Sequence, residues 1–384
     1  MHPRLATPSG KKRARALAIP FFGTPGEANA ITDVPGVAVG CSTLISGDGQ
    51  LRSGEGPVRT GVTAVLPRGH AGIGLPCAAG WYSLNGNGEM TGTAWIEESG
   101  ALALPILITN THAIGPCHKG IIDWVVRHRP DLAGEWLLPV VAETFDGYLN
   151  DVNGGHVRSE HAAAAIDAAA GGSIEEGSVG GGTGMNCYGF KGGNGTASRR
   201  VRYGAQSYTV GAFAQANFGA RRELIIAGVP VGRELADDDP LGDSWRAIAP
   251  GAGSVIVIVA TDAPLWPGQC RALARRVPLG LARTGASGSH FSGDLFLAFS
   301  TANEGALTSG FPKTSPSDES YETLRFIPWS RIDPFYEAVV QSVEEAVVNA
   351  LIANEAMIGR DGNRSPALPH DRVVALLKAR GALS

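Results

Sequence analysis

Cysteine is scarce in this sequence of 384 residues, which contains five cysteines. They are scattered and odd in number, and no two of them form a Cys-x-x-Cys pair. This spacing argues against a disulfide framework and against a zinc site built on paired cysteines. It favours a reducing compartment, so we expect a cytoplasmic protein. The five positions are Cys41, Cys77, Cys117, Cys187 and Cys270.

Charge of either sign is also modest, and long apolar runs are missing. Charged residues make up 18% of the chain and the formal net charge is −4, so the sequence has no global basic field for nucleic acid. We interpret the one basic cluster, at 11–15, as a solvated arm. The apolar stretch that follows it is short, is broken by Pro20 and shows no clear cleavage pattern of a signal peptide. No run reaches the length of a membrane span, so no membrane partner is expected.

The usual cofactor motifs are missing as well. Residues 171–195 hold eleven glycines, yet they form no nucleotide-binding fingerprint, and Lys191 has the wrong spacing for a phosphate loop. We interpret this region as turns that line a pocket. His112 and His118 have no acidic partner at metal-ligand spacing, and no Gly-x-Ser-x-Gly elbow lies near His290. We therefore expect neither a metal nor an organic cofactor, and no serine–histidine triad.

Glycine is what the chain has in excess, with 53 residues. Because the hydrophobic content of 43% is ordinary, this excess indicates tight turns and close backbone approach rather than disorder. The length and the apolar content suit a large core. We expect residues 1–384 to form a single domain.

Short apolar runs alternate with helical patterns along the chain, but without the strict βαβ rhythm of a doubly wound sheet. This predicts an α+β protein with stacked mixed sheets covered by helices. Residues 232–253 are polar, acidic and rich in Gly and Pro, which predicts an exposed linker. The predicted strands cover 36–41, 61–67, 104–110, 137–144, 208–214, 223–228, 255–259 and 293–300. The predicted helices cover 121–128, 159–170, 268–276, 333–354 and 370–379.

The junction Gly253–Ser254 carries the strongest chemical signal. A glycine turn runs into Ser254, and the serine opens the β-branched apolar run 255–259. If the bond before it is cut, Ser254 becomes a chain terminus with a hydroxyl and a free amine, the two groups of an N-terminal nucleophile. The alternative is a serine that simply begins a buried strand. Ser292 and Asp294, two apart on an extended segment, point the same way and form either a relay or ordinary turn chemistry.

Several segments taken together resemble the L-aminopeptidase D-amidase/D-esterase family, which includes the β-peptidyl aminopeptidases. The resemblance implies a four-layer αββα sandwich that looks like the N-terminal nucleophile hydrolases with its own connectivity. It also implies self-cleavage at Gly253–Ser254 into an α chain (1–253) and a β chain (254–384), and a homo-oligomer, a tetramer by family analogy. The matching segments are 29–37, 85–92, 142–144 with 147–151, 182–185 with 189–193, 253–265, and 292–294 with 298–303.

The same resemblance assigns the catalytic roles. Ser254 is the nucleophile, and its proton passes to its own amine or to Ser292, which Asp294 orients. Family members often carry Glu in place of Asp294, whose shorter arm changes the relay geometry. Asn217 matches the asparagine of the oxyanion hole, where a side-chain N–H stabilises the developing negative charge.

Two further positions match the family's substrate-binding residues. Glu143 matches the carboxylate that grips the free α- or β-amine of the substrate, which limits the enzyme to removing one N-terminal residue. Some relatives carry Tyr where this chain has Phe145, so the pocket lacks a hydroxyl. The resemblance thus implies a serine aminopeptidase that acts on short peptides, amino-acid amides or esters and needs no cofactor.

Three other functions remain open from the sequence. A β-peptide-specific aminopeptidase is the narrower version of the same activity. An acyltransferase of the ornithine acetyltransferase type shares the general architecture, but such proteins typically present Thr where this chain has Ser254. A non-enzymatic scaffold would leave Ser254 at a strand edge with no chemistry.

Overall fold

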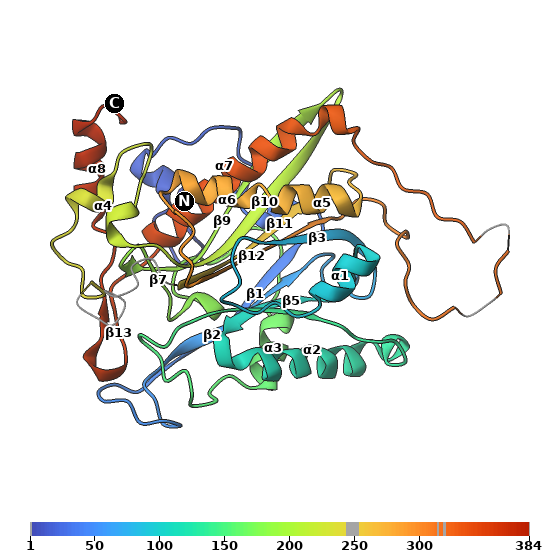
Figure 1. The fold of residues 1–384 in the computed structure, drawn as a ribbon, viewed down its shortest axis with the longest axis horizontal. Helices are drawn as coiled ribbons and strands as arrows, with labels where there is room; N and C mark the ends of the chain where they lie inside the picture. Colours follow the sequence, from blue (N-terminus) through green and yellow to red (C-terminus); the bar gives the residue numbers. More distant parts are fainter. Residues whose placement is uncertain (1, 243–252, 313–314, 318–319, 384) are drawn as a thin grey trace.

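Two β-sheets stacked face to face form the centre of the computed structural model, which describes residues 2–242, 253–312, 315–317 and 320–383 (Figure 1). The smaller sheet has the strand order β1-β2-β5-β6, in which β1, β2 and β5 are antiparallel and β6 runs parallel to β5. These strands are β1 (Ala38–Ser46), β2 (Val58–Leu66), β5 (Ile106–Asn110) and β6 (Val140–Thr144).

The larger sheet has the strand order β4-β3-β12-β11-β10-β9. Its central pair, β11 and β12, is parallel, and the other neighbours are antiparallel. Both faces of β11 are covered, which explains why its Val-Ile-Val-Ile-Val sequence is apolar without alternation. The strands are β3 (Cys77–Ser83), β4 (Ala101–Leu102), β9 (Gly193–Tyr203), β10 (Gln206–Asn217), β11 (Gly253–Thr261) and β12 (Ser292–Ser300).

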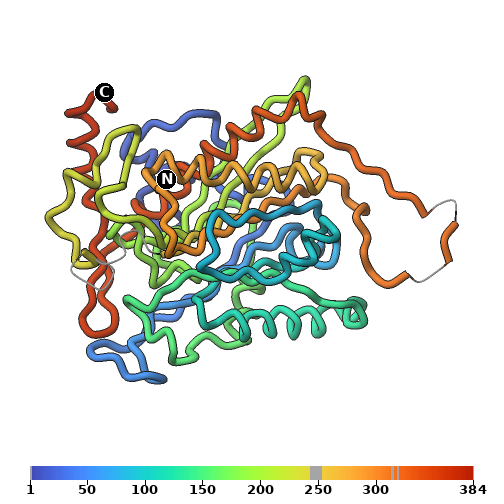
Figure 2. The backbone as a smooth tube through the Cα atoms, viewed as in Figure 1, coloured from blue at the N-terminus to red at the C-terminus, as the bar shows by residue number. Residues whose placement is uncertain are grey.

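Helices cover the outer face of each sheet, so the molecule has four layers. Helices α2 (Ile114–His128) and α3 (Ser159–Asp167) pack on the smaller sheet. Helices α5 (Pro267–Ala274), α6 (Val277–Arg283) and α7 (Asp333–Ile352) lie on the side of the larger sheet. The tube in Figure 2 shows the two helical layers on opposite sides of the strands. The αββα sandwich and the α+β class are therefore confirmed.

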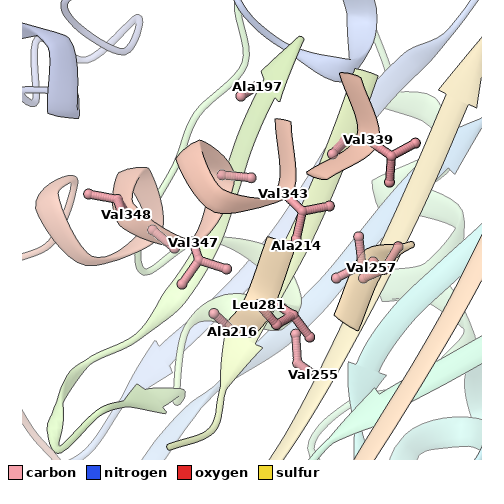
Figure 3. Close-up of a cluster of buried hydrophobic side chains, with 14 of the residues drawn as sticks. Ala197, Ala214, Ala216, Val255, Val257, Leu281, Val339, Val343, Val347 and Val348 are labelled. Carbon is pink, nitrogen blue, oxygen red and sulfur yellow. The ribbon is translucent and has the colours of Figure 1, made fainter. Parts of the chain in front are cut away.

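Three buried apolar clusters lie between the four layers. One joins the smaller sheet to α2 and α3, one lies between the sheets, and one joins the larger sheet to the helices. Figure 3 shows part of the third cluster, which includes Val343 and Val347 of α7, Ala214 of β10 and Val255 of β11. Consecutive residues of β11 alternate between clusters: Val255 and Val257 belong to the helix side, and Ile256 and Ile258 to the side between the sheets.

The remaining elements are short and lie around the sandwich. They are α1 (Thr93–Ser99), α4 (Val231–Glu234), α8 (His370–Ala379) and two small hairpins. The hairpins consist of β7 (Asn186–Cys187) with β8 (Phe190–Lys191), and of β13 (Met357–Ile358) with β14 (Arg364–Ser365). In the part of the chain that the structure describes, no helix is long and apolar enough to cross a membrane.

Three local predictions from the sequence are wrong. The basic cluster at 11–15 is not a solvated arm, because Arg13 is buried in an ion pair with Glu176 and Arg15 pairs with the buried Glu345. Residues 223–228 do not form a strand, because Ala227 and Gly228 have positive φ angles and turn the chain tightly between Ile226 and Val229. The predicted exposed linker at 232–253 includes part of α4, and Leu235 and Leu241 are buried. The segment 243–252 of that prediction lies outside the described residues.

Candidate active site

Ser254 lies at the start of β11, at the end of the molecule where β6 of the other sheet finishes. Its side chain is buried, and its Oγ accepts two hydrogen bonds. One comes from the main-chain N–H of Phe145 at 3.2 Å, and the other from Nδ2 of Asn217 at 3.3 Å. Phe145 directly follows β6, and Asn217 ends β10 beside Ser254. The hydroxyl therefore sits between the two sheets with an N–H donor from each.

The side chain of Asn217 is held in one orientation. Its Oδ1 accepts a hydrogen bond from the main-chain N–H of Asn186 at 2.9 Å, so Nδ2 must face the other way. There Nδ2 donates to the carbonyl oxygen of Phe145 at 2.9 Å and to Ser254 Oγ. Two N–H donors thus converge beside the hydroxyl, an arrangement that stabilises negative charge developing at that point.

Gly253 is required by packing at this junction. A Cβ atom built at Gly253 would lie 2.0 Å from the carbonyl oxygen of Asn217, far inside van der Waals contact. Its main-chain N–H donates to the carbonyl oxygen of Phe291 at 3.3 Å. Any larger residue would push the strand away from Asn217, so a glycine is needed to bring Ser254 to its position.

Ser292 and Asp294 form a buried pair on the neighbouring strand β12. The Ser292 hydroxyl donates to Asp294 Oδ1 at 2.5 Å, and the Asn85 side chain donates to Oδ2 at 3.0 Å. The main-chain N–H of Asp294 donates a hydrogen bond to Asn85 Oδ1 at 2.7 Å. Burial raises the pKa of Asp294 above its usual range, and the bonds from Ser292 and Asn85 oppose this rise.

The strand register places this pair on the opposite face of the sheet from the Ser254 hydroxyl. Ser254 is level with Gly293, whereas Ser292 is level with Gly253 and Asp294 with Val255. Residues that pair across neighbouring strands share a face, and Val255 faces the helices. The structure therefore does not bring the Ser292 hydroxyl to Ser254 Oγ. Instead the side chains of Ser254 and Ser292 lie on opposite faces of the sheet formed by β11 and β12.

Glu143 lies on β6, two residues before Phe145, and the residue is 3% exposed. Oε1 accepts a hydrogen bond from the Glu89 main-chain N–H at 3.0 Å, and Oε2 accepts one from the Thr111 hydroxyl. Burial raises the pKa of Glu143, and these two bonds partly offset the effect. Among the described residues no basic side chain forms an ion pair with it. A buried carboxylate without a counterion is suited to receive a cation from outside.

The loop after β3 closes the space between Glu143 and β12. A Cβ atom built at Gly88 would lie 3.2 Å from Glu143 Oε1 and 3.0 Å from the Cα of Gly293. Gly293 is the register partner of Ser254, so Gly88 lies between the carboxylate and the strand beside the nucleophile. The Glu143 carboxylate and the strand position beside Ser254 therefore lie on either side of Gly88, at the same end of the two sheets.

The structure gathers Ser254, Asn217, Glu143 and the Phe145 main chain into one site. The Phe145 ring lies against Gly147, whereas its peptide groups contact Ser254 and Asn217. Sequence reasoning missed this main-chain role, and it missed Asn186 and Asn85. Asn85 belongs to the matched segment 85–92, which could have pointed to it. Asn186 acts here through its main chain and left no signal in its residue type.

Among the described residues, the other candidate groups from the sequence form no hydrogen bond with this site, although the charge of His112 lowers the pKa of Glu143. His112 lines a surface pocket beside the start of α2, and the ring of His290 packs against Phe291. The five cysteines are free thiols. Within the described ranges no group of three or more His, Cys, Asp or Glu residues is close enough to hold a metal ion.

Comparison with known proteins agrees with this geometry. The family model described as Peptidase family S58 matches residues 29–365. "Beta-peptidyl aminopeptidase BapA" of Sphingosinicella microcystinivorans is 49% identical over 374 residues, which cover 95% of this chain and 92% of that protein.

Two solved structures have the same fold over nearly the whole chain. The L-aminopeptidase D-Ala-esterase/amidase of Ochrobactrum anthropi, described as a new variant among the Ntn hydrolase fold, is 45% identical with a TM-score of 0.89 and covers 97% of this chain and 99% of that one. A Burkholderia sp. β-aminopeptidase is 42% identical with a TM-score of 0.87 and covers 96% and 99%. Since the match spans the fold and the site alike, the chain belongs to peptidase family S58 and is a serine aminopeptidase of that family.

Proposed function

We propose that this enzyme is a β-peptidyl aminopeptidase that removes one N-terminal residue from short peptides and also accepts amino-acid amides. The observation that carries the proposal is the buried carboxylate of Glu143, which forms no ion pair among the described residues and lies across Gly88 from the strand position beside Ser254. A substrate ammonium group bound there would place the first carbonyl group at the nucleophile and leave no room for a preceding residue. The relatives named β-peptidyl aminopeptidase and β-aminopeptidase support the β preference.

The enzyme becomes active, in our proposal, by cutting itself between Gly253 and Ser254. Ser254 Oγ attacks the carbonyl carbon of Gly253, the peptide C–N bond breaks, and the nitrogen takes the hydroxyl proton. Water then hydrolyses the resulting ester, which frees the Gly253 carboxylate and restores the hydroxyl beside a free amine. The two chains, 1–253 and 254–384, would stay together because β11 is paired with β10 and buried on both faces.

Of the two proton acceptors that the sequence leaves open, we favour the amine of Ser254. The Ser292 hydroxyl faces the other side of the sheet and donates to Asp294. The main-chain nitrogen lies in the plane of the sheet, so it is accessible from both faces. This nitrogen can take the proton of Ser254 Oγ from one face of the sheet, while the Ser292–Asp294 pair orients the nitrogen from the other face. The acyl-enzyme forms on Oγ as the peptide nitrogen of the substrate leaves with that proton, and water then hydrolyses the ester.

A panel of aminoacyl p-nitroanilides with L-α, D-α and β residues tests the substrate class. We expect self-cleaved enzyme to release p-nitroaniline fastest from the β-residue substrates. Turnover of the α-residue substrates alone would contradict the β preference and leave the aminopeptidase activity intact. Membership of an aminopeptidase family argues against the acyltransferase and scaffold alternatives.

Within this panel, Glu143→Gln tests the ammonium contact. Glutamine keeps the size but loses the charge, so we expect kcat/KM to fall about 10- to 100-fold, mainly through KM, as for the loss of a hydrogen bond to a charged group. The carboxylate binds an ammonium only when ionised, and burial raises its pKa. As the pH is lowered, wild-type kcat/KM should therefore begin to fall at a higher pH than it would with an exposed glutamate. The Glu143→Gln variant should not show this fall.

Glu89→Gln is the matched control for Glu143→Gln. Glu89 is an exposed acid whose main-chain N–H bonds Glu143, and this bond survives the side-chain change. Its KM should stay close to that of the wild type, and the loss of activity on acidification should move to slightly lower pH, because the Glu89 charge helps to raise the pKa of Glu143. An unchanged KM in Glu143→Gln would show that the ammonium binds elsewhere.

We further propose that the enzyme is a homo-oligomer, with a tetramer as the family analogy implies. The segment between β12 and α7 extends away from the sandwich (Figures 1 and 2), and its described residues include Phe311, Tyr321 and Phe326, which are 50%, 88% and 54% exposed. Phe311 packs on Trp136 and Phe326 on Trp266, and the exposed parts of these aromatic side chains favour contact with a second copy. Light scattering of the purified enzyme measures the mass, and a monomer would contradict the proposal.

A further inference from the structure

Lys191 is a buried cation that the proposed mechanism does not use. It ends β8, and its side chain is fully buried. Its Nζ donates to the carbonyl oxygens of Met185 and Gly192, both at 2.8 Å. No carboxylate forms an ion pair with it in the described part of the chain. Burying an ammonium group against carbonyl groups alone is costly, so its position calls for a physical explanation.

The Met185 carbonyl group belongs to the same peptide unit as the Asn186 N–H. This N–H donates to Asn217 Oδ1 at 2.9 Å, and Asn217 Nδ2 in turn donates to Ser254 Oγ at 3.3 Å. A continuous chain of hydrogen bonds therefore runs from the Lys191 ammonium group through one peptide and one side-chain amide to the nucleophile. Hydrogen bonds linked in this way polarise one another, most strongly where a charge begins the chain and water is excluded.

We propose that Lys191 is a positioning residue for the aminopeptidase reaction, which orients and polarises the Asn217 amide through the Met185–Asn186 peptide. The ammonium group draws electron density toward the Met185 oxygen and makes the Asn186 N–H a stronger donor. That N–H in turn polarises the Asn217 amide, whose Nδ2–H then stabilises the oxyanion better. This inference rests on the proposed role of Asn217 in the oxyanion hole.

The surroundings of Lys191 allow its charge to change near neutral pH. Burial, together with the charge of Lys11, lowers the pKa of Lys191 to about 7. Cys187 would favour the charged form only as a thiolate, which burial suppresses by raising the thiol pKa. The neighbouring Asn354 and Pro366 contact the Lys191 main chain and carry no charge. The polarising charge is therefore present below about pH 7 and is lost above it.

Lys191→Met removes the charge while keeping an unbranched side chain. In self-cleaved variant enzyme we expect kcat for a β-aminoacyl p-nitroanilide to fall about tenfold with little change in KM, a smaller loss than the about 10²- to 10³-fold for a direct oxyanion donor. The wild type should lose kcat as the pH rises through about 7, and this limb should be absent in Lys191→Met. If Lys191 had only a structural role, the Lys191→Met variant would still lose kcat as the pH rises.

Asn354→Ala is the matched control. Asn354 Nδ2 donates to the carbonyl oxygens of Lys191, Gly192 and Ala350. It shares the Gly192 oxygen with Lys191 Nζ, but Met185 is not among its partners. This variant should lose stability and keep the wild-type kcat and pH profile. If Lys191→Met does not fold or cleave itself, wild-type acyl-enzyme offers a second measurement. Its ester carbonyl stretch should shift to higher frequency as the pH rises through about 7.

The outcomes separate this inference from the proposed function. A Lys191→Met enzyme with wild-type kcat and an unchanged pH profile, or an ester stretch independent of pH, would overturn the role of Lys191. If Asn217→Ala impairs turnover in the same experiment, the proposed function stands even though the role of Lys191 is wrong. If Asn217→Ala has wild-type kcat, the oxyanion role itself is wrong, and the Lys191 inference is overturned with it.

Discussion

Ser254→Ala is expected to yield one uncut chain of 384 residues with no measurable aminopeptidase activity. The variant lacks the hydroxyl that attacks Gly253, so the chain keeps its peptide bond and no free amine appears at residue 254. Removing a nucleophile of this kind lowers kcat by about 10⁶-fold, which is below detection with p-nitroanilide substrates. Intact-mass spectrometry and the substrate panel measure both effects on the same sample.

Ser287→Ala is a suitable control for this prediction. Ser287 lies on the loop before β12, is exposed, and donates to Glu223 rather than to a group of the site. We expect this variant to cleave itself and to turn over substrate as the wild type does. If purified Ser254→Ala appears as two chains, or hydrolyses the β-aminoacyl substrate normally, the nucleophile is another group and the mechanism is wrong.

The main elements of the fold were predictable because they follow from hydrophobic patterns. The apolar run after Ser254 predicts a strand buried on both faces, and β11 is the central strand that this pattern requires. The false strand at 223–228 has an equally apolar sequence. There the positive φ angles of Ala227 and Gly228 fold the run back on itself, and a glycine at one position is too weak a signal to show this.

The site was predictable only in part, for a different reason. Ser254, Asn217 and Glu143 carry side chains whose types point to their chemistry, and the structure brings them together. The N–H groups of Phe145 and Asn186 are main-chain donors, which every residue type except proline offers, so their contribution depends on the fold. Likewise, which face Ser292 occupies relative to Ser254 follows from the parallel register of β11 and β12, and neither segment contains this information by itself.

Asn217→Ala should lower kcat by about 10²- to 10³-fold, or roughly 3–4 kcal/mol, the loss observed when one oxyanion donor is removed. The Phe145 N–H remains, so residual activity should stay measurable, in contrast to Ser254→Ala. KM should change little, because the donor acts on charge that develops after binding. Self-cleavage should slow as well, since the same amide faces the hydroxyl that attacks Gly253. Single-turnover kinetics and the rate at which the two chains appear measure these effects.

Gln215→Ala separates lost catalysis from lost packing. Gln215 lies two residues before Asn217 on the same face of β10, is fully buried, and donates to Thr144 Oγ1 at 2.7 Å and the Thr109 carbonyl oxygen at 3.3 Å. Both variants leave a cavity between the sheets, so both should lower Tm. Because Asn217, unlike Gln215, donates to Ser254 Oγ, kcat should fall far more in Asn217→Ala. An equal fall in both variants would mean that Asn217 supports the sheets rather than the transition state.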